Sequence, residues 1–126
     1  MKSYTDLEQS KKLAEILPLK SADMWYWEWP TAPKYNNYEH PMFHKGDDIV
    51  NVPCWSLAAL LGVLESEIDG EEGETYQLNI EKDGTWWNVW YREKYDEANP
   101  IETESTEELI DACYEMIIKL HEQKLL

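Results

Sequence analysis

The densest group of potential ligands in this 126-residue chain is an acidic run near its middle, between positions 65 and 74. Acids at alternate positions followed by a glycine are typical of the start of a calcium-binding EF-hand loop, which also needs a bidentate carboxylate at its twelfth position. Counted from Glu65, position twelve is Tyr76, so the run predicts a solvated acidic connection and no calcium site. We treat it as a candidate acidic patch, formed by Glu65, Glu67, Asp69, Glu71, Glu72 and Glu74.

Two histidines form a second possible ligand pair. His40 and His44 are four residues apart, a spacing that on a helix would place both imidazoles on one face for zinc. Pro41 directly follows His40 and disfavours helical backbone there, and the sequence has no H-E-x-x-H pattern. We therefore expect surface histidines, with no metal site and no cofactor.

The candidate nucleophiles lack the surroundings that activate them. Ser56 has no nucleophile-elbow glycines, and neither Cys54 nor Cys113 has an evident partner histidine. The five glycines form no phosphate-binding pattern. We expect no catalytic residue and a protein that is not an enzyme, with both cysteines as reduced, buried thiols. Because no apolar leader precedes residue 10, a cytoplasmic location is expected.

The tryptophans form the most distinctive pattern. Trp25, Trp27 and Trp29 alternate along a predicted strand and so share one face, and the half-polar face of a predicted hairpin adds Trp86 and Trp90. If these faces coincide, five indoles form one interaction face, suited to a protein partner or to stacked sugars and flat ligands. The alternative is a second core layer, covered by the 31–48 loop and the first helix.

Five elements must position these groups. Apolar periodicity and capping-box patterns (Thr5 with Glu8, Ser105 with Glu108) predict helices near 5–17 and 105–122, and Pro53 and Gly62 bracket a short apolar helix near 53–61. A strand is expected near 22–29 and a β-hairpin at 75–92. The fold class is therefore α+β, with the hairpin and the strand in one small antiparallel sheet packed by the helices, in a single domain over residues 1–126.

The hairpin prediction rests on Asp83 and Gly84 as the two turn residues. With that turn, Ile80 faces Trp87 and Leu78 faces Val89 on the core face. A second face then combines polar residues with Trp86 and Trp90.

The net charge of the chain indicates which classes of partner to expect. The formal net charge is −15, and residues 65–111 alone hold 16 acidic and 3 basic residues. Nucleic acids and anionic membranes carry the same sign, so we expect neither as a direct partner. A basic protein is the partner that this charge favours.

Four segments carry a family resemblance: LEQSKKLAEILP (7–18), SADM (21–24), PCWSLAALL (53–61) and DACYEMII (111–118). They resemble a family of small uncharacterised proteins encoded by gut anaerobic bacteria and by their prophages and mobile elements. The resemblance implies a bacterial, often phage-associated, cytoplasmic protein. It implies no activity and no catalytic residue.

Two functions follow as hypotheses. The first is a small acidic interaction protein that binds a basic protein partner, for example by imitating a nucleic-acid backbone. The second is a small-molecule or glycan-binding module that uses the tryptophan face. Self-association through the broad last helix or the hairpin, giving a homodimer, is a third possibility that the sequence leaves open.

Overall fold

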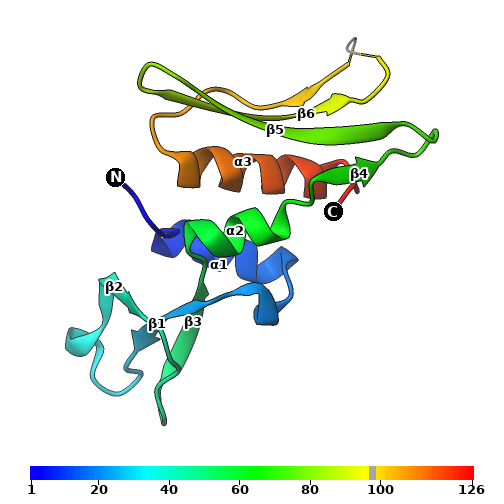
Figure 1. The fold of residues 1–126 in the computed structure, drawn as a ribbon. Coiled ribbons are helices and arrows are strands. Elements are labelled where there is room, and N and C mark those ends of the chain that lie inside the picture. Colours follow the sequence, from blue (N-terminus) through cyan, green and yellow to red (C-terminus); the bar gives the residue numbers. More distant parts are fainter. Residues whose placement is uncertain (97–98) are drawn as a thin grey trace. The chain divides into compact units, whose positions relative to one another are not determined.

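The structure is a computed structural model that describes residues 1–96 and 99–126. These residues form three α-helices, two short 3-10 helices and seven strands, which confirms the α+β class (Figure 1). In chain order the elements are α1 (Leu7–Ile16), η1 (Leu19–Ser21), β1 (Met24–Glu28), η2 (Pro33–Tyr35), β2 (Asn37–Met42), β3 (Val50–Cys54), α2 (Leu57–Val63), β4 (Glu67–Asp69), β5 (Thr75–Asp83), β6 (Trp86–Glu93), β7 (Ile101–Glu102) and α3 (Leu109–Glu122).

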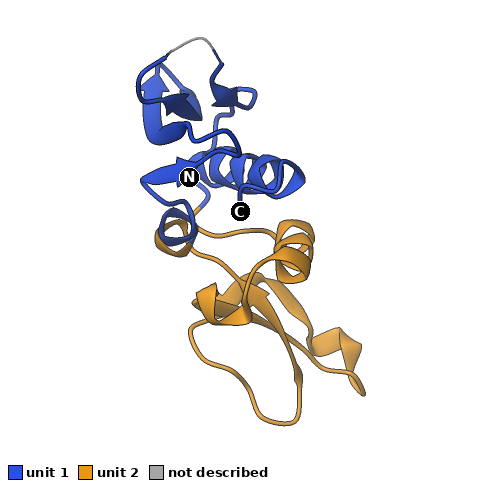
Figure 2. Ribbon diagram, turned by 90° about the vertical axis from the view of Figure 1, so that its right-hand side faces the viewer, with its two compact units in different colours: residues 1–2, 60–126 blue, residues 3–59 orange. Residues whose placement is uncertain are grey.

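The chain divides into two compact units, coloured in Figure 2. Unit 1 comprises residues 1–2 and 60–126, and unit 2 comprises residues 3–59. Unit 2 contains a three-stranded antiparallel sheet in the order β2-β1-β3, and unit 1 a four-stranded antiparallel sheet in the order β4-β5-β6-β7. The prediction that the strand near 22–29 joins the hairpin sheet is therefore wrong. Each edge of the hairpin pairs with a short strand close to it in sequence.

The core of unit 2 lies on one face of its sheet. Met24 and Tyr26 of β1 pair with Cys54 and Val52 of β3, and all four side chains are buried together. This arrangement confirms the predicted alternation along the first strand. It also leaves Trp25 and Trp27 on the opposite face of the sheet.

The N-cap of helix α1 lies one residue later than predicted. The capping box is formed by Asp6 and Gln9: the Asp6 carboxylate accepts the Gln9 N–H at 2.8 Å, and the Gln9 side chain accepts the Asp6 N–H at 3.1 Å. Thr5 is instead fully buried, and its hydroxyl oxygen accepts the backbone N–H of Trp55 at 3.1 Å. The predicted box of Thr5 with Glu8 is therefore wrong, because Thr5 is used inside the core.

The helix predicted near 53–61 begins later, and its first residues form a strand. Pro53 lies in β3 opposite Trp25. Because β3 is an edge strand, a residue without an N–H is tolerated there. Ser56 precedes α2 and accepts the Ala59 N–H at 3.2 Å, while Gly62 lies inside the helix and not beyond its end. Pro53 and Gly62 therefore mark neither the start nor the end of this helix, and the predicted bounds are wrong.

The hairpin of β5 and β6 exists, but its turn is one residue later than predicted. Gly84 and Thr85 are the turn residues, and Asp83 pairs with Trp86. Gly84 has a φ of 63° whereas Thr85 keeps a negative φ, as in a type II′ turn with glycine first. Each residue of β5 therefore pairs with the β6 residue two positions later than predicted, so Ile80 faces Val89 and not Trp87. Because the shift is two residues, the residues predicted to share each face of the hairpin still share it.

Helix α3 packs against β6 and fills the core of unit 1. It begins at Leu109, so the predicted start at 105 and the box of Ser105 with Glu108 are wrong. Thr106 is held outside the helix because its backbone exchanges two hydrogen bonds with Trp87. The buried side of the helix consists of Leu109, Ile110, Ala112, Cys113, Met116, Ile117 and Leu120.

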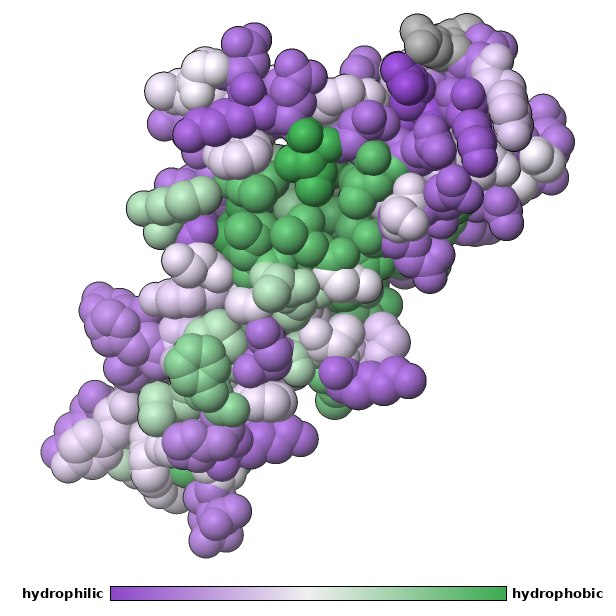
Figure 3. Space-filling model, in the orientation of Figure 1, coloured by the Kyte–Doolittle hydropathy of each residue, from purple (hydrophilic) through white to green (hydrophobic). Residues whose placement is uncertain are grey.

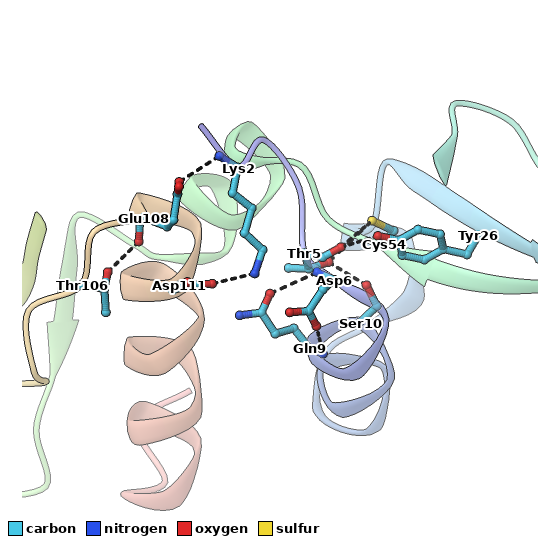
Figure 4. Close-up of polar contacts among 10 residues, drawn as sticks. All are labelled: Lys2, Thr5, Asp6, Gln9, Ser10, Tyr26, Cys54, Thr106, Glu108 and Asp111. Carbon is cyan, nitrogen blue, oxygen red and sulfur yellow. Dashed lines mark hydrogen bonds and ion pairs between the residues drawn. The ribbon is translucent and has the colours of Figure 1, made fainter. Parts of the chain in front are cut away.

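The first two residues of the chain belong to the same unit as α3. The backbone N–H of Lys2 donates to the Glu108 carboxylate at 2.8 Å, and its ammonium lies 2.8 Å from the Asp111 carboxylate (Figure 4). Hydrophobic residues gather over α3 in Figure 3, whereas the turn of the hairpin above it is hydrophilic. No helix formed by the described residues has the length and apolar character needed to cross a membrane.

Candidate functional site

The sheet of unit 1 has an inner face toward α3 and an opposite face, which we call the outer face. Ile68, Val89, Tyr91 and Ile101 point to the inner side and are buried. Strand alternation and register place the neighbouring residues on the outer face. These residues are Glu67, Asp69, Thr75, Gln77, Asn79, Glu81, Asp83, Trp86, Asn88, Trp90, Arg92 and Glu102.

The outer face combines aromatic surface with negative charge. Trp86 is 48% exposed and Trp90 is half-buried. Five of the twelve residues are acidic, and Arg92 is the one base among these described positions. The residues of unit 1 as a whole include 18 acids and 6 bases, against 8 acids and 5 bases in unit 2. The acidity therefore belongs to the unit that presents this face.

A groove of about 350 Å³ lies on the outer face. Its described lining includes Glu81, Trp90, Arg92, Glu102 and Thr103. The hydroxyl oxygen of Thr103 is buried and has no hydrogen-bond partner among the residues that the structure describes.

The predicted acidic patch is part of a folded hairpin. Glu67 and Asp69 lie in β4 opposite Gln77 and Thr75, and the turn after them closes with a bond of 2.8 Å from the Gly70 N–H to the Glu74 carbonyl. Glu65, Glu71 and Glu72 are exposed and Glu74 is half-buried. Among the described residues, no group of three or more His, Cys, Asp or Glu side chains could hold a metal ion.

The negative field of this patch acts on a neighbouring tyrosine. Burial raises the pKa of Tyr76, and the carboxylates of Glu74, Glu93 and Glu72 raise it further. Tyr91 anchors the start of the patch, because its hydroxyl donates to the Glu65 carbonyl at 2.6 Å. The carboxylates are thus held around one end of the sheet.

The three N-terminal tryptophans belong to unit 2. Trp25 and Trp27 share the sheet face opposite the core, and Trp29 lies just beyond β1 and is 37% exposed. The Trp27 indole N–H donates to the His44 carbonyl at 3.0 Å, and the two rings meet edge to face. Because the five tryptophans are divided between two sheets, the prediction of five indoles on one sheet face is wrong.

The cysteines, Ser56 and His40, which the sequence singled out as possible reactive or metal-binding residues, have ordinary structural roles or positions. Cys54 and Cys113 are free and buried, as predicted. Burial raises the pKa of both thiols, that of Cys113 to about 12. The Ser56 hydroxyl donates to the Asp23 carboxylate at 2.5 Å, next to its cap of α2. His40 is exposed in β2.

Sequence reasoning missed several residues that line the groove of the outer face, chiefly Arg92, Glu102 and Thr103. Alternation along the hairpin placed Glu81 on the same face as the tryptophans, and carried two residues past Trp90 it also predicts Arg92 there. No sequence pattern predicts β7, a strand of only two residues, which brings Glu102 to the same face. Comparisons of the chain with protein-family models, with curated proteins and with solved structures found no match.

Proposed function

We propose that this protein is a non-enzymatic binding protein that takes a basic protein partner onto the outer face of unit 1. One observation carries the proposal: Trp86 and Trp90 share that face with the carboxylates of Glu81, Asp83 and Glu102. Tryptophan is enriched among the residues that dominate binding energy at protein interfaces. Carboxylates around such an anchor suit lysine and arginine side chains.

The charge of unit 1 supports the choice of a basic partner. An excess of 12 acidic over basic residues in this unit attracts cations over the Debye length, about 10 Å at 0.1 M salt. Such attraction raises the association rate and weakens as salt is added. Nucleic acid and anionic membrane surfaces are repelled by the same field.

The biological context that we propose for this protein rests on the sequence alone. The resemblance to proteins of prophages and mobile elements favours a bacterial cytoplasmic protein whose partner is a basic protein of the host. Self-association into a homodimer is compatible with this proposal, because hydrophobic residues lie together over α3 in Figure 3. Size-exclusion chromatography with light scattering measures that state directly.

The test is a pull-down from bacterial lysate with charge-matched variants. We expect a basic protein to be retained at about 50 mM salt and released at about 0.5 M salt. The double variant Glu81→Gln/Glu102→Gln should lose it, whereas Glu8→Gln/Glu39→Gln, which removes two exposed carboxylates from unit 2, should keep it. No retained basic protein at low salt, or equal loss in both variants, contradicts the proposal.

A small-molecule or glycan-binding function is the second candidate, favoured by the groove on the outer face. Trp90 offers a surface for a flat ring or sugar, and the side chains of Glu81, Arg92 and Glu102 in the same lining offer polar contacts. This function predicts a saturable change in tryptophan fluorescence when disaccharides are titrated. Trp90→Phe should abolish that change, and its absence from the wild-type protein argues for the protein partner.

A further inference from the structure

A groove of about 590 Å³ lies in unit 2, on the sheet face opposite the core. Trp25, Asn51 and Pro53 form its base, because they occupy neighbouring positions on one face of β1 and β3. Leu19, Lys20, Ala22 and Lys45 complete the lining. None of the described residues that line it is acidic, although the whole chain has 26 acidic residues.

The lining of the groove includes two lysines, Lys20 and Lys45. Lys11 and Lys12 of the same unit lie 3.6 and 3.7 Å from the carboxylates of Glu28 and Glu15. Within the described residues, Lys20 and Lys45 have no such partner; the Lys45 ammonium lies 5.8 Å from the centre of the Trp25 ring. An exposed cation–π contact is weak, so this ammonium can exchange it for an anion.

The backbone that carries Lys20 is anchored to the core of unit 2. Lys20 lies in η1, where the Ser21 hydroxyl donates to the Pro18 carbonyl at 2.6 Å. The same hydroxyl oxygen accepts the indole N–H of Trp55 at 3.0 Å, and Trp55 is fully buried. The position of the Lys20 backbone is therefore set before any ligand arrives.

The backbone beside Lys45 is fixed in a similar way. The Asn51 side chain accepts the Gly46 N–H at 2.9 Å and donates to the Gly46 carbonyl at 3.0 Å. On the other side of Lys45, the His44 carbonyl accepts the Trp27 indole N–H at 3.0 Å. Both lysines thus project from segments that are already ordered, which lowers the entropic cost of binding.

We propose that this groove binds a small organic anion that carries a flat ring. The two ammonium groups would hold a phosphate or carboxylate, and Trp25, Leu19 and Pro53 would contact the ring. A long polyanion is disfavoured by the net charge of −15, so the ligand is a small molecule and not a nucleic acid. The site is independent of the proposed partner face, since all its lining residues belong to unit 2.

Isothermal titration calorimetry with four probes tests the proposal. Adenosine monophosphate and indole-3-acetate combine a ring with a phosphate or a carboxylate, whereas adenosine and inorganic phosphate each lack one part. We expect at least one of the first two to bind saturably, about tenfold or more tighter than both of the others. Saturable binding of either probe supports the site.

A pair of charge-matched variants then locates the binding. Lys20→Gln/Lys45→Gln should weaken the bound probe by about tenfold or more, because it removes both charged contacts. Lys12→Gln/Lys34→Gln removes the same charge from unit 2 outside the groove and should change affinity by less than about threefold. The proposal is overturned if neither ring-bearing anion binds below about 10 mM, or if the two variants weaken binding equally.

Discussion

Trp90 lies directly opposite Glu102 across the β6–β7 pair, so an indole and a carboxylate occupy adjacent positions on the outer face. Two residues along the same strand, Arg92 lies opposite Gln77. Aromatic, acidic and basic side chains therefore come from four strands but share one face. This register, more than any single residue, makes the face a candidate for binding.

The first prediction concerns the accessibility and electrostatic surroundings of Trp86. Trp86 is 48% exposed, whereas Trp55 is fully buried. We expect Trp86→Phe to lower acrylamide quenching of tryptophan fluorescence clearly, and Trp55→Phe to leave it unchanged or raise it. Because Asp83 lies opposite Trp86 and the outer face is acidic, caesium ions should quench Trp86 better than iodide ions at equal ionic strength.

The matched control for this quenching experiment is Trp27→Phe. Trp27 is half-buried in unit 2 and its ring meets His44. Its replacement should not change the ratio of caesium to iodide quenching. Equal quenching by the two ions in the wild-type protein would show that the outer face has no negative potential.

The second prediction concerns Thr5, which is fully buried and joins three parts of unit 2 (Figure 4). Its hydroxyl lies 2.7 Å from the Ser10 hydroxyl and 3.1 Å from the Trp55 nitrogen, and its carbonyl accepts the Tyr26 hydroxyl at 2.7 Å. Thr5→Val keeps the shape but leaves a buried N–H without its acceptor. We expect the free energy of unfolding to fall by about 1–3 kcal/mol in urea denaturation.

The control for Thr5 is Thr31→Val, the same substitution at an exposed position. It should change the free energy of unfolding by no more than about 0.5 kcal/mol. Equal and small effects at both positions would mean that the Thr5 hydroxyl contributes nothing to the core.

Sequence patterns predicted the individual helices and strands better than they predicted which strands pair with each other. The alternation of β1, the hairpin, α1 and most of α3 could be identified because each has its own periodicity. The strands β4 and β7 have three and two residues, too short for any periodic signal. In unit 2, β1 pairs instead with β2 and β3, of which β2 lies in the segment predicted as a loop and β3 extends into the start of the predicted helix. The division into two sheets could therefore not be derived from the sequence.

The same limit applies to the candidate sites. The tryptophans and the acidic run could be recognised from residue type alone. Alternation also correctly placed Trp25 with Trp27 on one face of β1, and Trp86 with Trp90 on one face of the hairpin. Lys20 and Lys45 are 25 positions apart and belong to no shared pattern, so only the fold brings them to one groove. The buried role of Thr5 was hidden by an apparent capping box, because Asp6 is an equally good cap.

The third prediction concerns stability in alkali. Burial raises the pKa of Cys113 and of Tyr91 to about 12, above the ordinary values of 9.0 and 10.0. Between these values the unfolded chain loses both protons while the folded chain keeps them. Their contribution to stability is therefore complete below pH 9 and is lost as the pH rises toward 12. Urea denaturation at several pH values should show this decline.

Two variants separate the titration from simple loss of packing. Cys113→Ala should flatten the decline from pH 9 upward because it removes a titrating group. Met116→Ala leaves a cavity in the same buried helix face without removing such a group, so it should lower stability equally at every pH. An unchanged slope in Cys113→Ala would contradict the assignment.

The fourth prediction compares two glycines at which an added methyl group meets no atom within 4 Å. Gly62 lies inside α2 with ordinary helical backbone, so Gly62→Ala should raise the free energy of unfolding by about 0.5–1 kcal/mol. Gly84 has a φ of 63° in the hairpin turn, so Gly84→Ala should lower it by about 1–2 kcal/mol. Because neither change alters contacts, opposite signs in urea denaturation would trace the difference to the backbone alone. Effects of the same sign would contradict either the helix at Gly62 or the turn at Gly84.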